Sequence, residues 1–147
     1  MNSFFKILSL QTKSLLDIID ITDKIKAFVK EAKIKDGLIN IQSLHTTATV
    51  FVNENEPLLL EDLKKHLERI APVNNVYEHD DFEKRTVNMC EDECANGHSH
   101  CKAIHLPTSV CLNIKDNKIQ FGPWQSIMFI ELDRARKREI QIQILGE

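Results

Sequence analysis

The stretch LINIQSLHTTATVFV, residues 38–52, decides how this chain is expected to fold. Residues 38–43 and 46–52 alternate between apolar and polar side chains and are rich in β-branched residues, which is typical of β-strands. The polar segment 53–56 ends the second of these strands. Toward the N-terminus, the Phe-, Ile- and Leu-rich residues 4–11 predict a further strand.

Two helices are expected on either side of this central stretch. The first begins near Asp20, has apolar residues at helical spacing, and stops at Gly37. Pro57 suits the first turn of the second helix, and Pro72 ends it. The order strand, helix, two strands, helix is therefore predicted for the first half of the chain.

The second half of the chain predicts mainly strands. The candidates are residues 98–105, 109–115, 118–122, 126–133 and 138–145. Asp116-Asn117 fits a tight hairpin turn. Many strands with two helices early in the chain predict a single α+β domain over residues 1–147. We expect an antiparallel, jelly-roll-like β-sandwich with two main helices.

Composition narrows the class of protein. The chain has 147 residues, 42% hydrophobic and 28% charged, with a formal net charge of -3. This balance argues against a nucleic-acid or anionic-membrane binder, which would carry a basic surface. The apolar run at the N-terminus is short and is interrupted by Lys6, so no signal sequence is predicted. We expect a cytoplasmic protein with free thiols.

Histidines suggest a metal site. In a strand at 98–105, His98 and His100 would point to one face of the sheet. His45, in another predicted strand segment, is the natural third ligand. Three imidazoles suit a divalent transition metal such as zinc and leave a coordination position for water or substrate. The alternative is that these are ordinary surface histidines.

The cysteines offer a second, weaker metal hypothesis. Cys90, Cys94 and Cys101 cluster around the histidine pair, so a mixed Cys/His zinc site is conceivable. The spacing of Cys90 and Cys94 is not that of a common zinc knuckle, and Cys101 would point away from His98 and His100 on a strand. Free thiols are the simpler interpretation.

Several polar residues could join such a site. Glu54 or Asp80 could act as a general base on a metal-bound water or orient an imidazole, although acidic loop residues are usually only solvated. Thr46 and Thr47 could bind a phosphate or carboxylate. Trp124 could stack on a ring, or simply pack. Three arginines form a candidate anion clamp, or are plain surface charges: Arg134, Arg136 and Arg138.

The polar segment 73–97 is unusually long for a loop in a compact domain. Loops of this length are usually functional or disordered. Because this one leads directly into the histidine pair, we interpret it as part of the functional site.

The order of these motifs is more specific than any one of them. Along the chain come His45-Thr46-Thr47-Ala48, Asn53-Glu54, Pro57 with its helix, Tyr77-Glu78-His79-Asp80, Asn96-Gly97-His98-Ser99-His100, Gly122-Pro123-Trp124-Gln125 and Glu131. This series resembles the YjbQ family, also called the secondary thiamine-phosphate synthase family, over roughly residues 4–146. The chain departs from the usual family pattern mainly in turns, for example with Pro123 in place of a threonine.

The resemblance implies a compact β-sandwich with flanking helices, assembled as a homotrimer, with a pocket near the subunit contacts. It also implies a weak thiamine-phosphate synthase activity. The family pattern points to these residues of this chain: His45, Asn53, Glu54, His79, Asp80, Asn96, His98, His100, Trp124, Gln125 and Glu131.

Combining the two lines of reasoning gives each candidate residue a predicted role. The catalytic candidates are Glu54, Asp80, Asn96 and Gln125. The substrate-binding candidates are Thr46, Thr47, Asn53, Trp124 and Arg138. The metal candidates are His45, His98 and His100, with His79 as a further ligand. The expected cofactor is a divalent metal such as zinc, or magnesium if the synthase activity is genuine.

The predicted function is that of a metal- or phosphate-binding protein with a phosphorylated small-molecule substrate. The predicted reaction is a thiamine-phosphate synthase-type transfer. A non-catalytic trimeric metal- or anion-binding protein, or a metal-assisted hydrolase, are the alternatives.

Overall fold

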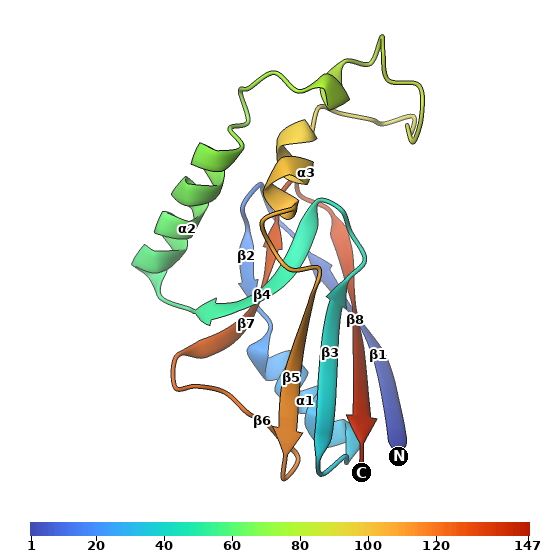
Figure 1. Ribbon diagram of the computed structural model, residues 1–147, viewed down its shortest axis with the longest axis vertical. Helices are drawn as coiled ribbons and strands as arrows, with labels where there is room; N and C mark the ends of the chain where they lie inside the picture. The colour runs from blue at the N-terminus through green and yellow to red at the C-terminus, as the bar shows by residue number, and fades with distance from the viewer.

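The computed structural model describes residues 1–147 and confirms the α+β class (Figure 1). Its strands are β1 (Asn2–Gln11), β2 (Ile18–Asp20), β3 (Gly37–Ser43), β4 (Ala48–Glu54), β5 (Ser109–Lys115), β6 (Lys118–Ile119), β7 (Gln125–Glu131) and β8 (Lys137–Gly146). Its helices are α1 (Thr22–Ala32), α2 (Pro57–Ile70), the short α3 (Gly97–Ala103) and the 3-10 turn η1 (Glu78–Asp80).

The strands form two antiparallel sheets. The five-stranded sheet has the order β1-β8-β3-β5-β6, and the three-stranded sheet has the order β2-β7-β4. The central stretch identified from sequence supplies one strand to each sheet, β3 and β4. The turn between them, residues 44–47, therefore passes from one sheet to the other at their shared end.

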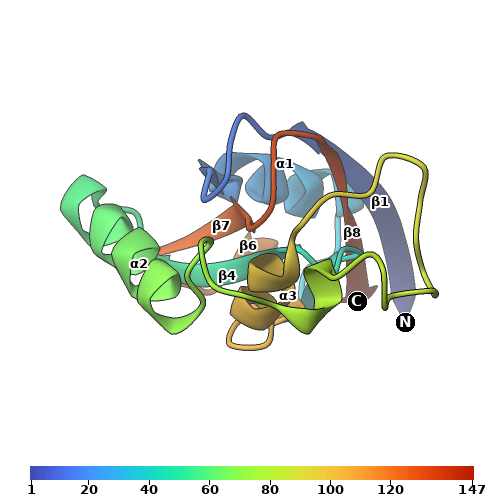
Figure 2. The ribbon, with the colours of Figure 1, turned by 90° about the horizontal axis from the view of Figure 1, so that it is seen from above.

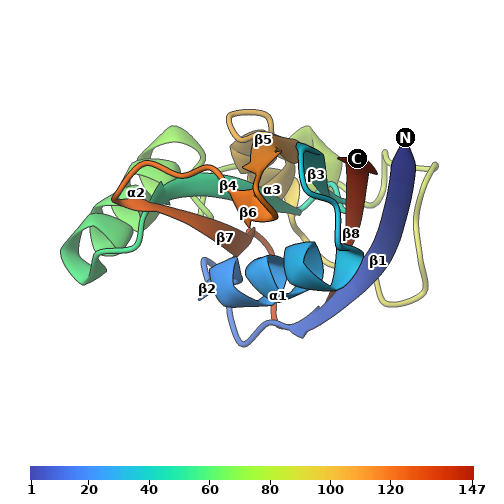
Figure 3. The same cartoon turned by 90° about the horizontal axis from the view of Figure 1, so that it is seen from below.

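The main core fills the space between the inner faces of the two sheets and α1. Alternate residues of β3 and β8, such as Ile41 and Ile142, are completely buried there, and Ile25 and Val29 of α1 join them. α1 lies alongside β1, β6 and β7 (Figure 3). This burial of one face of each strand follows the period-two pattern that predicted the strands.

A smaller core lies on the opposite face of the three-stranded sheet. There Met128 and Ile130 of β7 and Phe51 of β4 pack against Leu67 of α2. α2 and α3 therefore cover this face, and the segment that joins them extends beyond the ends of the strands (Figure 1). None of the helices is both long and apolar enough to cross a membrane.

The strand predicted at 98–105 is wrong, because residues 97–103 form α3. The shared face predicted for the two histidines is wrong for the same reason. In an α-helix, residues two apart point in roughly opposite directions. The short β2 was also missed, and the strand expected at 46–52 begins only at Ala48.

Candidate functional site

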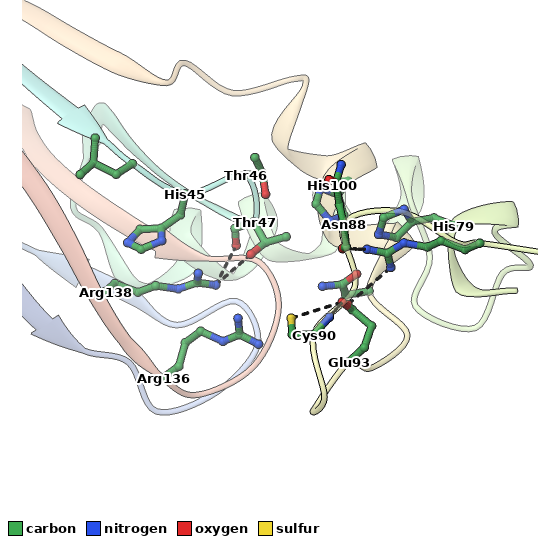
Figure 4. Close-up of a pocket in the computed structure, with 13 residues that line it drawn as sticks. His45, Thr46, Thr47, His79, Asn88, Cys90, Glu93, His100, Arg136 and Arg138 are labelled. Atoms are coloured by element: carbon green, nitrogen blue, oxygen red, sulfur yellow. Dashed lines mark hydrogen bonds and ion pairs between the residues drawn. The ribbon is translucent and has the colours of Figure 1, made fainter. Parts of the chain in front are cut away.

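A polar pocket of about 490 Å³ lies where the 44–47 turn, the beginning of β8, α3 and the 79–93 segment meet (Figure 4). One wall is built on the ends of the sheets, and the opposite wall comes from α3 and the segment that precedes it. Seen from above, that segment runs past α3 along one side of the molecule (Figure 2). The long loop expected to be functional thus lines this polar pocket.

His45 is fixed in the turn by the backbone around it. The Ser43 hydroxyl donates to Ala48 O at 2.7 Å and accepts from His45 N at 3.3 Å. The Nε2 atom of His45 accepts the backbone N–H of Glu139 at 2.9 Å. β3 ends at Ser43, which pairs with Ile140 of β8. The adjacent residue of β8 is Glu139, and its backbone N–H is bound by the His45 imidazole in place of a further residue of β3. With Nε2 as acceptor, the neutral ring carries its proton on Nδ1.

Arg138 is the most buried cation of the pocket. Its Nε and Nη2 atoms donate to the two carboxylate oxygens of Glu131 at 2.7 and 2.5 Å, and Nη2 also donates to Thr47 Oγ1 at 3.0 Å. Thr12 Oγ1 donates to Glu131 at 3.0 Å from the other side. This network holds the guanidinium rigidly and leaves its Nη1 without a partner in the chain.

Arg85 is held by the loop that carries it. Its Nη2 donates to Asn88 O at 2.6 Å, and its Nε donates to Val87 O at 3.4 Å. Its Nη1 lies 3.5 Å from Glu93 Oε1, close enough for an ion pair but without hydrogen-bond geometry. Cys90, whose backbone N–H and thiol both donate to Glu93, lines the pocket beside them.

Asp80 joins the 79–93 segment to α3. Its Oδ1 accepts the backbone N–H groups of Asn96 at 2.9 Å and of Gly97 at 2.8 Å, at the N-terminus of the helix. This contact brings His79 against His100, with ring centroids 4.6 Å apart in an edge-to-face arrangement. The structure therefore places Asp80 as a helix cap.

Three buried side-chain polar atoms in the whole chain lack a hydrogen-bond partner, and all three belong to residues that line this pocket. They are His79 Nε2, Arg85 Nη1 and Asn96 Oδ1. Buried polar groups are almost always paired in folded proteins, so the concentration of such atoms at one place makes this pocket the candidate functional site.

Burial and nearby cations favour neutral imidazoles in this region. Burial lowers the pKa of His45 below its ordinary value, and the positive charge of Arg138 lowers it further. Burial likewise lowers the pKa of His100, with a smaller contribution from His79 and Arg85. Hydrogen bonding to Glu93 raises the pKa of the Cys90 thiol, so this thiol is not an activated nucleophile.

The predicted three-histidine metal site is not formed within the chain. His98 points into the interior, where its Nδ1 lies 3.2 Å from Nζ of the fully buried Lys102. An ammonium at that distance competes with any metal for the same nitrogen. No group of three or more His, Cys, Asp or Glu side chains is disposed to hold a metal ion, so the donor set does not fit the ion that the sequence predicted.

The structure divides the predicted site residues into two separate sets. The pocket contains His45, Thr46, Thr47, His79, Asn96, His100 and Arg138. A second set lies at the far end of β4 and β7, where Glu54 pairs with Gln125, whereas Glu131 at the pocket end pairs with Ala48. Six residues of strand separate the two ends by ~20 Å. Asn53, Glu54, Trp124 and Gln125 are all exposed at this far end, Trp124 to 71%.

Sequence reasoning missed several pocket residues that come from the long loop. Arg85, Asn88 and Glu93 line the pocket but belong to no recognisable motif, and Cys90, considered from sequence only as a zinc ligand or a free thiol, lines it as well. The available signal was the position of the loop next to the histidine pair. Arg136 lines the pocket, as predicted for a member of the anion clamp. Arg134 does not line it and instead donates hydrogen bonds to Cys94 Sγ and Asp92 O.

The fold and this pocket define a small α+β sandwich protein with a basic, imidazole-rich pocket. The profile of the family described as UPF0047 protein YjbQ-like matches residues 6–147. The chain is 33% identical over 140 residues to a UPF0047 protein of Methanothermobacter thermautotrophicus, which covers 95% of this chain and 90% of that protein. It is 28% identical over 142 residues to UPF0047 protein YugU of Bacillus subtilis, covering 96% and 98% of the two chains.

Solved structures agree with these sequence matches. A YjbQ-like protein of Sulfolobus solfataricus, described as of unknown function, superposes with a TM-score of 0.86 at 29% identity over 99% of both chains. A YjbQ/UPF0047 family protein of Clostridium acetobutylicum superposes with a TM-score of 0.82 at 30% identity, over 95% of this chain and 99% of the other. The chain belongs to the YjbQ-like UPF0047 family, as the order of its motifs predicted.

Proposed function

We propose that the pocket binds the phosphate group of a small phosphorylated substrate. The observation that carries this proposal is that three buried atoms without a hydrogen-bond partner, two nitrogens and one oxygen, belong to residues that line one cavity. Arg85 Nη1 can donate to a phosphate oxygen, and so can the His79 Nε2–H tautomer. Asn96 Oδ1 can accept from a hydroxyl or ring N–H of the same ligand.

The arginines of the pocket suit an anion for a second reason. Each of three arginines in the pocket forms an ion pair with a carboxylate. The pairs are Arg85 with Glu93, Arg136 with Asp133, and Arg138 with Glu131. These ion pairs fix the guanidinium groups before a ligand arrives, so binding costs little further side-chain entropy. The remaining N–H groups can then recognise phosphate oxygens.

The finer proposal is a thiamine-phosphate synthase-type transfer, and it rests on the family resemblance. In this reaction the C–O bond between a pyrimidine methylene group and diphosphate breaks, and the diphosphate leaves with the bonding electrons. The thiazole nitrogen of the second substrate forms a C–N bond to the same carbon. Arg85 and Arg138 would stabilise the charge that develops on the departing diphosphate.

Calorimetric titration with inorganic phosphate and diphosphate tests the binding step. A charged hydrogen bond contributes about 1.5–3 kcal/mol, so we expect Arg85→Gln to weaken binding by about tenfold or more. Arg134→Gln is the matched control, because Arg134 does not line this pocket, and it should bind within about twofold of wild type. Absence of binding to the wild-type protein at millimolar anion would reject the proposal.

Turnover separates an enzyme from a binding protein. Release of diphosphate from the pyrimidine diphosphate and thiazole phosphate should be measured with and without magnesium, using Arg85→Gln as the inactive reference. Phosphate binding without turnover would favour the non-catalytic alternative. Elemental analysis of the purified protein for zinc and iron tests the divalent metal, which stays a prediction from sequence.

We further propose that the protein is a homotrimer that uses the outer face of the five-stranded sheet. Four large apolar side chains are about half exposed on this face: Phe5, Ile7, Leu38 and Leu145. Their neighbours across the strands are uncharged, for example Asn40, Gln141 and Gln143. An exposed patch with apolar residues and few charges is typical of an interface between subunits.

A further inference from the structure

The two ring nitrogens of His45 have different surroundings. Nε2 accepts the backbone N–H of Glu139 at 2.9 Å. Nδ1 has no hydrogen-bond partner within the chain, and it is not among the fully buried atoms that lack one, so it remains accessible. Because the half-buried imidazole lines the polar pocket, Nδ1 is open to a ligand there.

The contact with the backbone decides which nitrogen of His45 carries the proton. A proton on Nε2 would face the N–H of Glu139, and two donors this close repel each other. In this conformation the ring is therefore neutral and carries its proton on Nδ1. The lowered pKa of His45 agrees with this charge state, because burial and the charge of Arg138 both disfavour the imidazolium ion. Nδ1 is then a hydrogen-bond donor, which cannot act as a base or bind a metal ion unless it loses that proton.

The surroundings of this donor favour an anion. Arg138 lies on the same wall of the pocket, as Figure 4 shows, and its Nη1 is likewise unpaired and accessible. The one carboxylate that lines the pocket, Glu93, belongs to the opposite wall and pairs with Arg85. An oxygen of an anion that binds Arg138 would therefore meet a second donor in the ring of His45.

We infer that His45 binds an oxygen of the phosphate group through Nδ1–H, as a neutral hydrogen-bond donor that the backbone of β8 holds in place. This inference rests on the proposed function and adds a binding residue with a defined tautomer. It assigns His45 to the ligand, where the sequence predicted a metal ion. A donor that is already oriented loses little freedom when it binds a charged oxygen.

Two substitutions separate the roles of the two nitrogens. His45→Asn places an amide N–H close to the position of Nδ1 but does not reach the N–H of Glu139. His45→Gln reaches that N–H with its amide oxygen but has no donor near the position of Nδ1. In calorimetry with inorganic phosphate, His45→Asn should bind within about threefold of wild type and His45→Gln about tenfold or more weakly. Urea unfolding should rank the two variants in the opposite order.

This reversal distinguishes a residue that binds the ligand from one that only supports the fold. If His45 only stabilised the end of β3, phosphate binding would follow stability and His45→Asn would be the weaker binder, which would overturn the inference. Equal binding by wild type and both variants would overturn it as well. Failure of wild type to bind phosphate would instead reject the proposed function itself.

Nitrogen-15 NMR of the labelled wild-type protein gives a second measurement, which needs no variant. At about pH 7.5 the His45 ring should have a protonated Nδ1 and an unprotonated Nε2, and phosphate should shift the signal of the Nδ1 proton. The exposed His105 is the reference for changes outside the pocket. The opposite tautomer, or loss of the Nδ1 proton when zinc alone is added, would contradict the inference whether or not phosphate binds.

Discussion

At the scale of single residues, the interior placement of His98 has a consequence for stability. Its ring lies beside Lys102, which is 0% exposed and donates from Nζ to Ala71 O at 2.6 Å. The carboxylate of Glu68 lies 3.2 Å from the same Nζ and forms an ion pair with it. A protonated His98 would face this ammonium at close range, and the folded state therefore disfavours its protonation.

This arrangement predicts that the protein loses stability as the pH falls below neutral. Burial lowers the pKa of His98, and Lys102 lowers it further; burial also lowers the pKa of His45 and His100. Above the ordinary histidine pKa of about 6.5 the rings are neutral in both the folded and the unfolded state. As the pH falls below that value the unfolded chain binds protons first, so the free energy of unfolding decreases until the lowered pKa values of the folded state are passed.

Urea unfolding at several pH values between 7.5 and 5 measures this loss. His98→Gln keeps an oxygen that can accept from Lys102 but cannot be protonated, so its stability should decline less steeply than that of wild type. The same change at exposed His105 is the control and should leave the slope unaltered. A stability that is constant across this range would contradict the described environment of His98.

At the scale of secondary-structure elements, local signals explain which predictions succeeded. Asp116 and Asn117 both have positive φ angles, 50° and 56°, as a two-residue hairpin turn between β5 and β6 requires. The alternating patterns of β3 and β8 reflect a face buried against the core. In each case the residues that determine the structure are adjacent in sequence.

α3 was missed because its determinants are distant in sequence. The helix has only seven residues, too few for a clear helical period, and its N-cap Asn96 makes no side-chain capping bond. The first backbone N–H groups of the helix, those of Asn96 and Gly97, donate to Asp80, which lies 16 residues before Asn96 in the sequence. No local capping motif therefore marks its beginning.

Removing this cap should destabilise the helix and the pocket together. Asp80→Ala leaves the N–H groups of Asn96 and Gly97 without their acceptor, and we expect a loss of about 1–2 kcal/mol in the free energy of unfolding. Phosphate binding should weaken as well, because the contact between His79 and His100 depends on the same junction. Asp80→Asn keeps an oxygen acceptor and should lose less of both. Loss of binding or turnover at unchanged stability would instead favour the catalytic role predicted from sequence.

At the scale of the whole molecule, the site could be predicted only in part. The order of motifs that resembles the family pointed to residues at both ends of the β4–β7 pair. It did not predict that ~20 Å of strand separates Glu54 from the pocket end of the pair. Nor could spacing alone predict that Arg85, on an irregular loop, lines the same pocket as Arg138 on a strand. Such relations depend on how the two sheets and the loop pack, which no short segment encodes.

The proposed trimer would explain the separation of the two sets of predicted site residues. We propose that the exposed end that bears Asn53, Glu54, Trp124 and Gln125 completes the pocket of a neighbouring copy. Trp124→Ala and Arg85→Gln should then each weaken phosphate binding by about tenfold or more in the pure variant. Light scattering on both variants separates loss of binding from loss of assembly, and a trimer is expected for both because the larger contact is the sheet face proposed above.

Mixed trimers of the two variants distinguish this proposal from a pocket that is complete in each chain. In a cyclic trimer that contains both kinds of subunit, exactly one pocket combines an intact Arg85 with an intact Trp124 from its neighbour, whichever variant is in excess. Co-expressed and doubly affinity-purified trimers should therefore regain binding at one site per trimer. The proposal is wrong if Trp124→Ala alone binds phosphate as wild type does, or if the mixed trimers do not regain binding. In either case the exposed end has no part in the pocket.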